Sequence, residues 1–146
     1  MRIVFNDKTR TFSAAPAVQF LYRRWTTKGG VQLKDIPKLW DIVEKYAELS
    51  EIKGFGTDWT DRDFLYGIAF PGTVSDKALS EAKRVFPDIK LDKAYVLPSK
   101  WQLVRKGDLS DMGEMYQEIW SKGDLKNELE EYPEKGKCII KVNYEN

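Results

Sequence analysis

An internal repeat constrains the fold of this chain more than any other feature of its sequence. The apolar stripe of one predicted helix recurs in a second predicted helix 76 residues later. The matched positions are Ile36 with Met112, Leu39 with Met115, Trp40 with Tyr116, and Val43 with Ile119. Pro16 and Pro98, which are 82 residues apart, lie in the alternating segments that precede these helices. We therefore predict one domain over residues 1–146 that contains two copies of a unit, at about residues 14–72 and 92–143.

The first copy has the pattern of a strand, a helix, a loop and a strand. Side chains alternate between two faces over residues 14–27, with Phe20 on one face and Trp25 on the other, which predicts a strand that the next glycines end. A helix is predicted from Asp35, whose side chain can cap its first turn. The glycine-rich and polar segment over residues 54–63 predicts a loop, and alternation over residues 64–70 predicts a second strand.

The second copy repeats this order. Residues 94–106 alternate and predict a single strand, interrupted by a proline. Ser110 or Asp111 can cap the helix that follows. Two short strands are predicted after that helix, over residues 125–132 and 137–143.

A unit with one helix and about three strands is too small to bury its own apolar faces, so the two copies must share a core. We predict an α+β fold in which the duplicated strand–helix–strand–strand units form one antiparallel sheet with two main helices on one face. A third helix is predicted between the copies, over residues 75–86. Such an arrangement leaves a cleft at the pseudo-twofold axis between the two helices that carry aromatic side chains.

The residue types present exclude several kinds of chemistry. The chain has no histidine and a single cysteine, Cys138, so Ser-His-Asp and Cys-His nucleophile systems cannot form. Zinc and other transition metals would be left with carboxylates alone, which they rarely use. Neither Gly29-Gly30 nor the Gly54-Phe55-Gly56 segment fits a phosphate-binding fingerprint. We expect no metal and no cofactor, and an acid–base role in any enzyme would fall to Glu, Asp, Tyr or Lys.

Charge and hydropathy suggest the surroundings in which the protein works. The net charge is +1 with both signs mixed along the chain, so direct binding of nucleic acid is not expected. No segment has the roughly 20 apolar residues that cross a bilayer, and the N-terminus lacks the pattern of a secretory signal. With one cysteine and no such segment, a cytoplasmic location without membrane contact is expected.

Aromatic residues are unusually frequent, with five Trp, seven Tyr and seven Phe. The candidate ligand-binding residues are Glu130 and seven aromatic residues: Trp40, Trp59, Tyr66, Trp101, Tyr116, Trp120 and Tyr132. An aromatic stripe on a helix also fits ordinary core packing, which is the alternative for Trp40 and Tyr116. Trp59 is either a lid over the cleft or part of a plain surface loop.

Several segments resemble the bacterial GyrI-like effector-binding domains. In the first half they are PAVQFLYRRWTTKGG, IPKLWDIVEKYAEL, GFGTDW and FLYGIAF. In the second half they are AYVLPSKWQLVRKGDLSDMGEMYQEIW, LEEY and CIIKV. The resemblance extends from about Pro16 to Val142, and it implies a paired-unit antiparallel sheet with the helices on one side.

The resemblance also implies a function and a central residue. Many members of this family are the multidrug-sensing parts of AraC-type or MerR-type transcription regulators that recognise lipophilic cations. The family carboxylate lies in a strand similar to Leu129-Glu130-Glu131-Tyr132, which assigns its role to Glu130. Alternation puts Glu128 and Glu130 on one face of this strand and Glu131 on the other. Because the match to the family strand can shift by one position, the sequence leaves open which of the three carboxylates faces the cleft. The competing interpretation is a solvated edge strand, in which acidic residues discourage pairing with other chains.

Three functions follow as hypotheses. The first is a stand-alone binding module without a DNA-binding domain, which senses or sequesters a lipophilic, cationic small molecule. The second follows a single-domain branch of the family and is hydrolysis of an electrophilic small-molecule toxin, with Glu130 as the acid or base. The third is an interaction with a separate protein partner, such as DNA gyrase or a regulator. Without histidine, binding is favoured over catalysis.

Overall fold

The computed structural model describes residues 2–6, 11–15, 17–26 and 33–145. Pro16 and the Gly29-Gly30 break, which the sequence analysis uses, lie outside these residues. The strands are β1 (Arg2–Asn6), β2 (Thr11–Ala15), β3 (Val18–Thr26), β4 (Lys53–Thr57), β5 (Asp63–Phe70), β6 (Lys90–Tyr95), β7 (Leu103–Asp108), β8 (Leu125–Glu131) and β9 (Lys137–Tyr144). The α-helices are α1 (Ile36–Val43), α2 (Asp76–Val85) and α3 (Met112–Ser121), and short 3-10 turns lie at Leu33–Asp35, Leu49–Glu51 and Leu109–Asp111.

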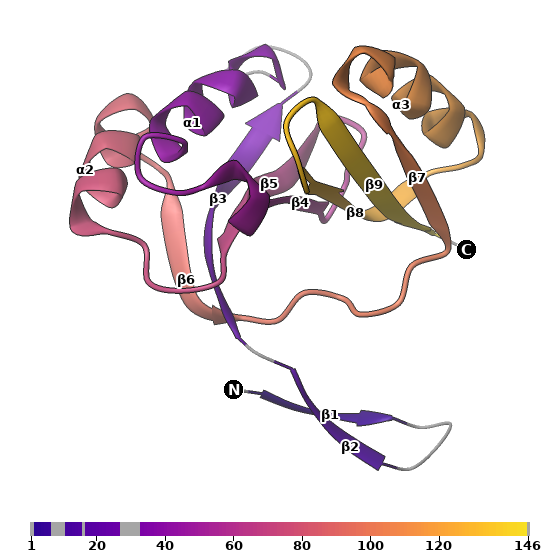
Figure 1. Cartoon of the computed structure of the whole chain (residues 1–146), viewed down its shortest axis with the longest axis horizontal. Helices are drawn as coiled ribbons and strands as arrows, with labels where there is room; N and C mark the ends of the chain where they lie inside the picture. The colour runs from indigo at the N-terminus through magenta and orange to yellow at the C-terminus, as the bar shows by residue number, and fades with distance from the viewer. Residues whose placement is uncertain (1, 7–10, 16, 27–32, 146) are drawn as a thin grey trace.

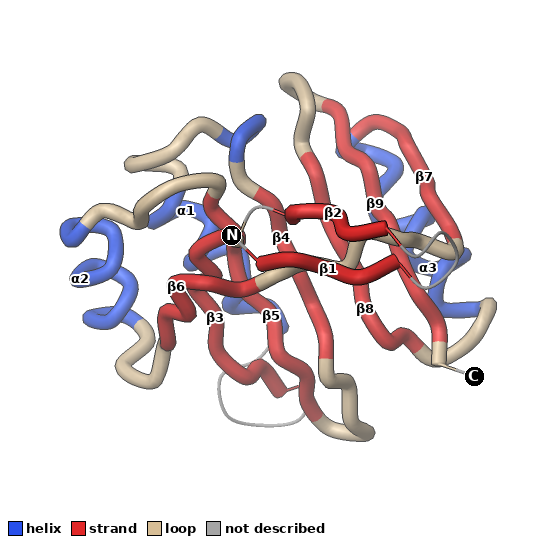
Figure 2. The backbone as a smooth tube through the Cα atoms, turned by 90° about the horizontal axis from the view of Figure 1, so that it is seen from below, coloured by secondary structure: helices blue, strands red, loops and turns tan. Residues whose placement is uncertain are grey.

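Seven of the strands form one antiparallel sheet in the order β6-β3-β5-β4-β8-β9-β7. The three α-helices lie on one face of this sheet (Figure 1). The predicted α+β class, with an antiparallel sheet, is therefore confirmed in the described part of the chain. Strands β1 and β2, which the sequence analysis does not predict, pair with each other in a separate two-stranded sheet on the side of the main sheet away from the helices (Figure 2).

The core lies mainly between the sheet and the helices. Under α1 and α2 the side chains of Leu21 and Trp25 on β3 pack with Leu39 of α1, and all three are fully buried. Under α3 a smaller cluster joins Ile119 to Ile140 of β9. The two clusters have no fully buried side chain in common.

The opposite face of the sheet has its own apolar cluster. Phe20 of β3 packs there with Phe55 of β4 and Leu129 of β8. Part of the segment that connects β6 to β7, including Trp101, covers this cluster. The predicted alternation of β3, with Phe20 on one face and Trp25 on the other, is confirmed by this distribution.

The helices begin where the sequence indicates, although two of the predicted caps are not made. Ser75 caps α2, and its side chain accepts a hydrogen bond from the backbone N–H of Ala78 at 3.1 Å. Asp35 and Asp111 precede α1 and α3 without a side-chain cap hydrogen bond. Both have helical backbone angles because a 3-10 turn leads directly into each helix, whereas a capping side chain needs an extended residue at that position.

Two other predictions about strands are wrong. Residues 94–106 do not form one strand, since β6 and β7 lie at opposite edges of the sheet and the chain crosses beneath the sheet between them (Figure 1). Residues 54–63 are not entirely a loop, because β4 occupies Lys53–Thr57 at the centre of the sheet. In the sequence the two glycines of β4 are typical of a turn, but in the structure they leave room for side chains of β8.

Within the residues that the structure describes, no helix combines the length and the apolar character that crossing a membrane requires.

Candidate functional site

A cavity of about 530 Å³ opens between α1 and α3, above the sheet. Its walls come from the two helices, from β5 and β8, and from the loop before β5. The described residues that line it are Ile36, Pro37, Trp40, Trp59, Phe64, Tyr66, Met112, Tyr116, Trp120, Glu128, Glu130 and Tyr132. The cavity lies where the two halves of the sheet meet, at the β4–β8 pairing in the centre of Figure 1.

The structure brings seven of the eight predicted ligand-binding residues to this cavity. They are Trp40, Trp59, Tyr66, Tyr116, Trp120, Glu130 and Tyr132. Trp101 is elsewhere, because it packs against the cluster on the opposite face of the sheet. The sequence predicts a strand at Trp101, whereas its segment is the connection between β6 and β7.

The three acidic residues at the end of β8 divide between the two faces of the sheet. Glu128 and Glu130 line the cavity and are only 5% and 7% exposed. Glu131 points to the other face, where Lys141 lies 2.6 Å and Lys53 3.5 Å from its oxygens. Burial raises the pKa of Glu131, but the two lysines more than offset this and leave it below its ordinary value. Two carboxyl groups therefore face the cavity, where the sequence analysis assigns one.

Glu130 is held by tyrosine hydroxyls. Tyr66 donates to Oε1, and Tyr116 donates to Oε2 at 2.7 Å. The indole N–H of Trp40 donates to the Tyr66 hydroxyl at 3.0 Å, which leaves the Tyr66 proton for Glu130. Burial raises the pKa of Glu130, and hydrogen bonds from Tyr66, Tyr116 and Tyr132 act in the opposite direction.

Glu128 is buried but has fewer partners. Its Oε2 atom has no hydrogen-bond partner in the described structure. Burial raises the pKa of Glu128 well above its ordinary value, and the neighbouring charge of Glu130 raises it further. Contact with the Tyr116 hydroxyl opposes this shift only in part. The cavity thus contains one carboxyl group with several hydrogen bonds and one that favours its neutral form.

The glycines of β4 make room for these two carboxyl groups. In the antiparallel register Gly54 faces Glu130, and Gly56 faces Glu128. A Cβ atom on Gly54 would lie 2.6 Å from Glu130 Oε1, and one on Gly56 would lie 3.0 Å from Glu128 Cγ. Glycine inside a strand often marks such a close approach, and this explains why a glycine-rich segment occupies the centre of the sheet.

Aromatic pairs form the sides of the cavity. Trp59 stacks on Phe64 with ring centroids 4.1 Å apart and an interplanar angle of 3°. Tyr116 and Trp120 are in contact at 5.4 Å on α3, and more than half of the Trp120 surface is exposed. The lining of the cavity therefore includes a stacked pair, Trp59 and Phe64, and a solvent-exposed indole, Trp120.

Five lining residues are missing from the predicted ligand-binding set: Ile36, Pro37, Phe64, Met112 and Glu128. The repeat contains a signal for two of them, since Ile36 and Met112 are equivalent in the 76-residue offset. Alternation along β8 places Glu128 on the same face as Glu130, so this residue could also have been found. Nothing in the local pattern separates Phe64 from an ordinary core residue.

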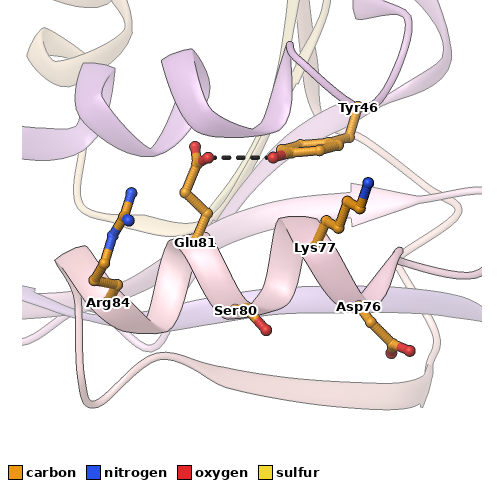
Figure 3. Close-up of a pocket in the computed structure, with 6 residues that line it drawn as sticks. All are labelled: Tyr46, Asp76, Lys77, Ser80, Glu81 and Arg84. Carbon is orange, nitrogen blue, oxygen red and sulfur yellow. Dashed lines mark hydrogen bonds between the residues drawn. The ribbon is translucent and has the colours of Figure 1, made fainter.

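Another hollow, of about 420 Å³, is lined by residues of α2 and by Tyr46, which follows α1 (Figure 3). Of its two carboxylates, Asp76 and Glu81, the second accepts hydrogen bonds from Lys45 at 2.9 Å and from the Tyr46 hydroxyl at 3.2 Å. The charge of Glu81 is thus balanced within the protein. The side chains that the structure describes include no cluster of acidic and cysteine residues able to hold a metal ion.

A comparison of the chain with protein-family models found no match, and a comparison with curated proteins found no significant sequence match.

Proposed function

We propose that this protein binds lipophilic cations in the cavity between α1 and α3, as an effector-binding-like domain. The observation that carries the proposal is the pair of buried carboxyl groups, Glu128 and Glu130, in an aromatic cavity. None of the described residues that line this cavity is a lysine or an arginine. A cationic ligand would supply the positive charge that the protein does not.

The energetics favour a cation over a neutral molecule of the same shape. Buried carboxyl groups are costly to ionise alone, and an opposite charge within a few ångströms restores the ionised form. Each good contact between the cation and an aromatic ring face adds about 0.5–2 kcal/mol. Because flat rings accept many flat ligands, we expect broad specificity among such cations.

The proposal also covers the fold, in which two copies of one strand–helix–strand–strand unit form the sheet. Strand order supports it, since β3-β5-β4 in one half corresponds to β7-β9-β8 in the other, about the β4–β8 pairing. Strands β5 and β9 are both eight residues long and begin 74 residues apart. Trp40 on α1 and Tyr116 on α3, which match in the repeat, line the cavity from opposite sides. A pseudo-twofold axis through the cavity accounts for these relations.

Tryptophan fluorescence provides a direct test, because Trp40, Trp59 and Trp120 line the cavity. The probes are 9-aminoacridinium, a flat cation at pH 7.5, and acridine, its neutral counterpart at that pH. We expect saturable quenching by the cation at micromolar concentrations and much weaker quenching by acridine. Glu130→Gln and Glu128→Gln should each weaken the binding of the cation without weakening that of acridine.

Glu131→Gln is the matched control, since Glu131 lies on the same strand but faces the other side of the sheet. Its titration should follow the wild type. Equal affinity for acridine and 9-aminoacridinium in the wild-type protein would contradict the proposal, as would quenching that does not saturate with either.

One observation favours hydrolysis as a second candidate. The raised pKa of Glu128 beside the hydrogen-bonded Glu130 resembles the acid and base pair of enzymes that cleave bonds with water. With an epoxide as substrate, Glu130 would take a proton from a water molecule while the water oxygen forms a bond to an epoxide carbon. The strained C–O bond would break, and Glu128 would give its proton to the departing oxygen. Formation of a diol from styrene oxide, lost in Glu128→Gln, would support this candidate, and an uncatalysed rate in the wild type would refute it for epoxides.

A further inference from the structure

We propose that Glu128, rather than Glu130, contacts the cationic head group, and that the cavity selects head groups with N–H donors over quaternary ammonium ions. The selected class comprises primary and secondary ammonium ions and amidinium ions. This inference rests on the proposed function and adds the chemistry of recognition to it.

The oxygens of Glu130 are already in use. Oε1 accepts the Tyr66 proton, and Oε2 accepts the Tyr116 proton at 2.7 Å. The Tyr66 hydroxyl in turn accepts from Trp40, so its only proton is committed to Glu130. Each oxygen keeps a second lone pair, but its charge is already partly compensated by a phenol, so a ligand gains less from a bond to Glu130 than from one to an unpartnered oxygen. Glu130 is thus already hydrogen-bonded within the protein, although burial still leaves its pKa above the ordinary value.

One oxygen of Glu128 is available. Its Oε2 atom is buried, lies in the cavity lining and has no partner among the described residues. Tyr116 has a single hydroxyl proton, which cannot serve both carboxyl groups at once: turned to Glu128 it would favour the ionised form, and while it donates to Glu130 it can only accept from Glu128. Glu128 can satisfy that acceptor only while it carries its own proton. Among the described residues no donor bonds to Glu128 Oε2, and the Trp59 N–H in the same lining is also without a partner.

A ligand must supply the hydrogen-bond donor that an ionised Glu128 lacks. A cation of any kind favours loss of the Glu128 proton, which leaves a buried carboxylate with unpaired oxygens. An ammonium or amidinium N–H pairs with these oxygens, whereas a quaternary ammonium ion supplies charge without a donor. The aromatic walls attract both kinds of cation, so they do not distinguish them. The difference in affinity between matched cations therefore isolates the bond to Glu128.

The test uses calorimetric titration at pH 7 with four probes that share a naphthalene ring. These are 2-naphthylmethylammonium, (2-naphthylmethyl)trimethylammonium, neutral 2-naphthylmethanol and neutral 2-neopentylnaphthalene. The last has the shape of the trimethylammonium probe and shows whether that head group fits. In the wild type we expect the primary ammonium to bind about tenfold or more tightly than the trimethylammonium, the gain typical of a charged hydrogen bond.

Variants identify the carboxyl group responsible for this ratio. In Glu128→Gln the ratio should fall below about threefold, while in Glu130→Gln it should persist even though both cations bind more weakly. A wild-type ratio near one, with the neopentyl probe binding normally, would overturn the inference without any variant. A ratio that collapses in Glu130→Gln and persists in Glu128→Gln would also overturn it. If neither cation binds more tightly than 2-naphthylmethanol, the proposed function itself fails.

Discussion

Glu128 and Glu131 lie three residues apart on β8, and their removal should change the pH dependence of stability in opposite directions. For Glu128, burial and the charge of Glu130 raise the pKa in the folded protein. In the unfolded chain a glutamate titrates near pH 4.3. Between these two pKa values the folded state holds one more proton than the unfolded state. The contribution of Glu128 to the free energy of unfolding is complete below the unfolded pKa. It falls by about 1.4 kcal/mol per pH unit as the pH rises towards the folded pKa.

For Glu131 the sign is reversed. Lys141 and Lys53 outweigh burial and lower its pKa, so its contribution exists above the unfolded pKa and is lost as the pH falls. Glu131 is partly exposed and its lysines more so, and solvent screening should limit the contribution to less than about 1 kcal/mol. The fully buried Glu128 should therefore give the larger of the two effects.

The assay is urea unfolding of the wild type, Glu128→Gln and Glu131→Gln, followed by fluorescence at half-unit steps from pH 3 to 8. The free energy of unfolding of Glu128→Gln minus that of the wild type should rise with pH and then level off. The same difference for Glu131→Gln should fall with pH. Because Glu128 and Glu130 interact, the first curve reports the titration of the pair. A flat curve for Glu128→Gln between pH 5 and 8 would refute the claim that Glu128 keeps a proton in the folded protein.

Three further predictions test the packing around the cavity. Gly54→Ala should destabilise the protein by about 1–3 kcal/mol, because its Cβ would meet Glu130 Oε1 at 2.6 Å. Urea unfolding checks this against Gly72→Ala, where a Cβ meets nothing within 4 Å, and equal stability of the two variants would contradict it. Ile140→Ala should cost about 2–5 kcal/mol in the same assay, since the side chain is fully buried under α3, and a loss below about 1 kcal/mol would argue against that core. Trp101→Ala should leave the affinity for 9-aminoacridinium within about twofold of the wild type, because Trp101 packs on the opposite face of the sheet.

The parts of the fold that were predictable are those in which periodicity reports burial. Alternation in β3 separates Phe20 from Trp25, and alternation in β8 separates Glu130 from Glu131, as the structure has them. The stripe on α1 includes the fully buried Leu39. In each case one face of an element meets the core, so the pattern of side chains is a direct record of the packing.

The parts that failed depend on long-range pairing. A single alternating run over residues 94–106 is divided between the two edges of the sheet, and only the pairing of β6 with β3 and of β7 with β9 decides this. The pattern of the run itself is the same in either arrangement. The space for two carboxyl groups in the cavity likewise depends on which residues β4 presents opposite β8, which no local signal specifies.

The glycines of β4 also explain why the negative charge of the cavity comes from one half of the sheet. On the proposed duplication, α1 and α3 contribute similar walls, with Trp40 opposite Tyr116. The central strands differ, since β4 presents Gly54 and Gly56 where β8 presents Glu130 and Glu128. Even one carbon on Gly54 would be too close to Glu130, so a carboxyl group there has no space. Packing across the β4–β8 pair thus limits the site to two carboxyl groups, and any symmetric pattern of four is excluded by volume before charge repulsion is considered.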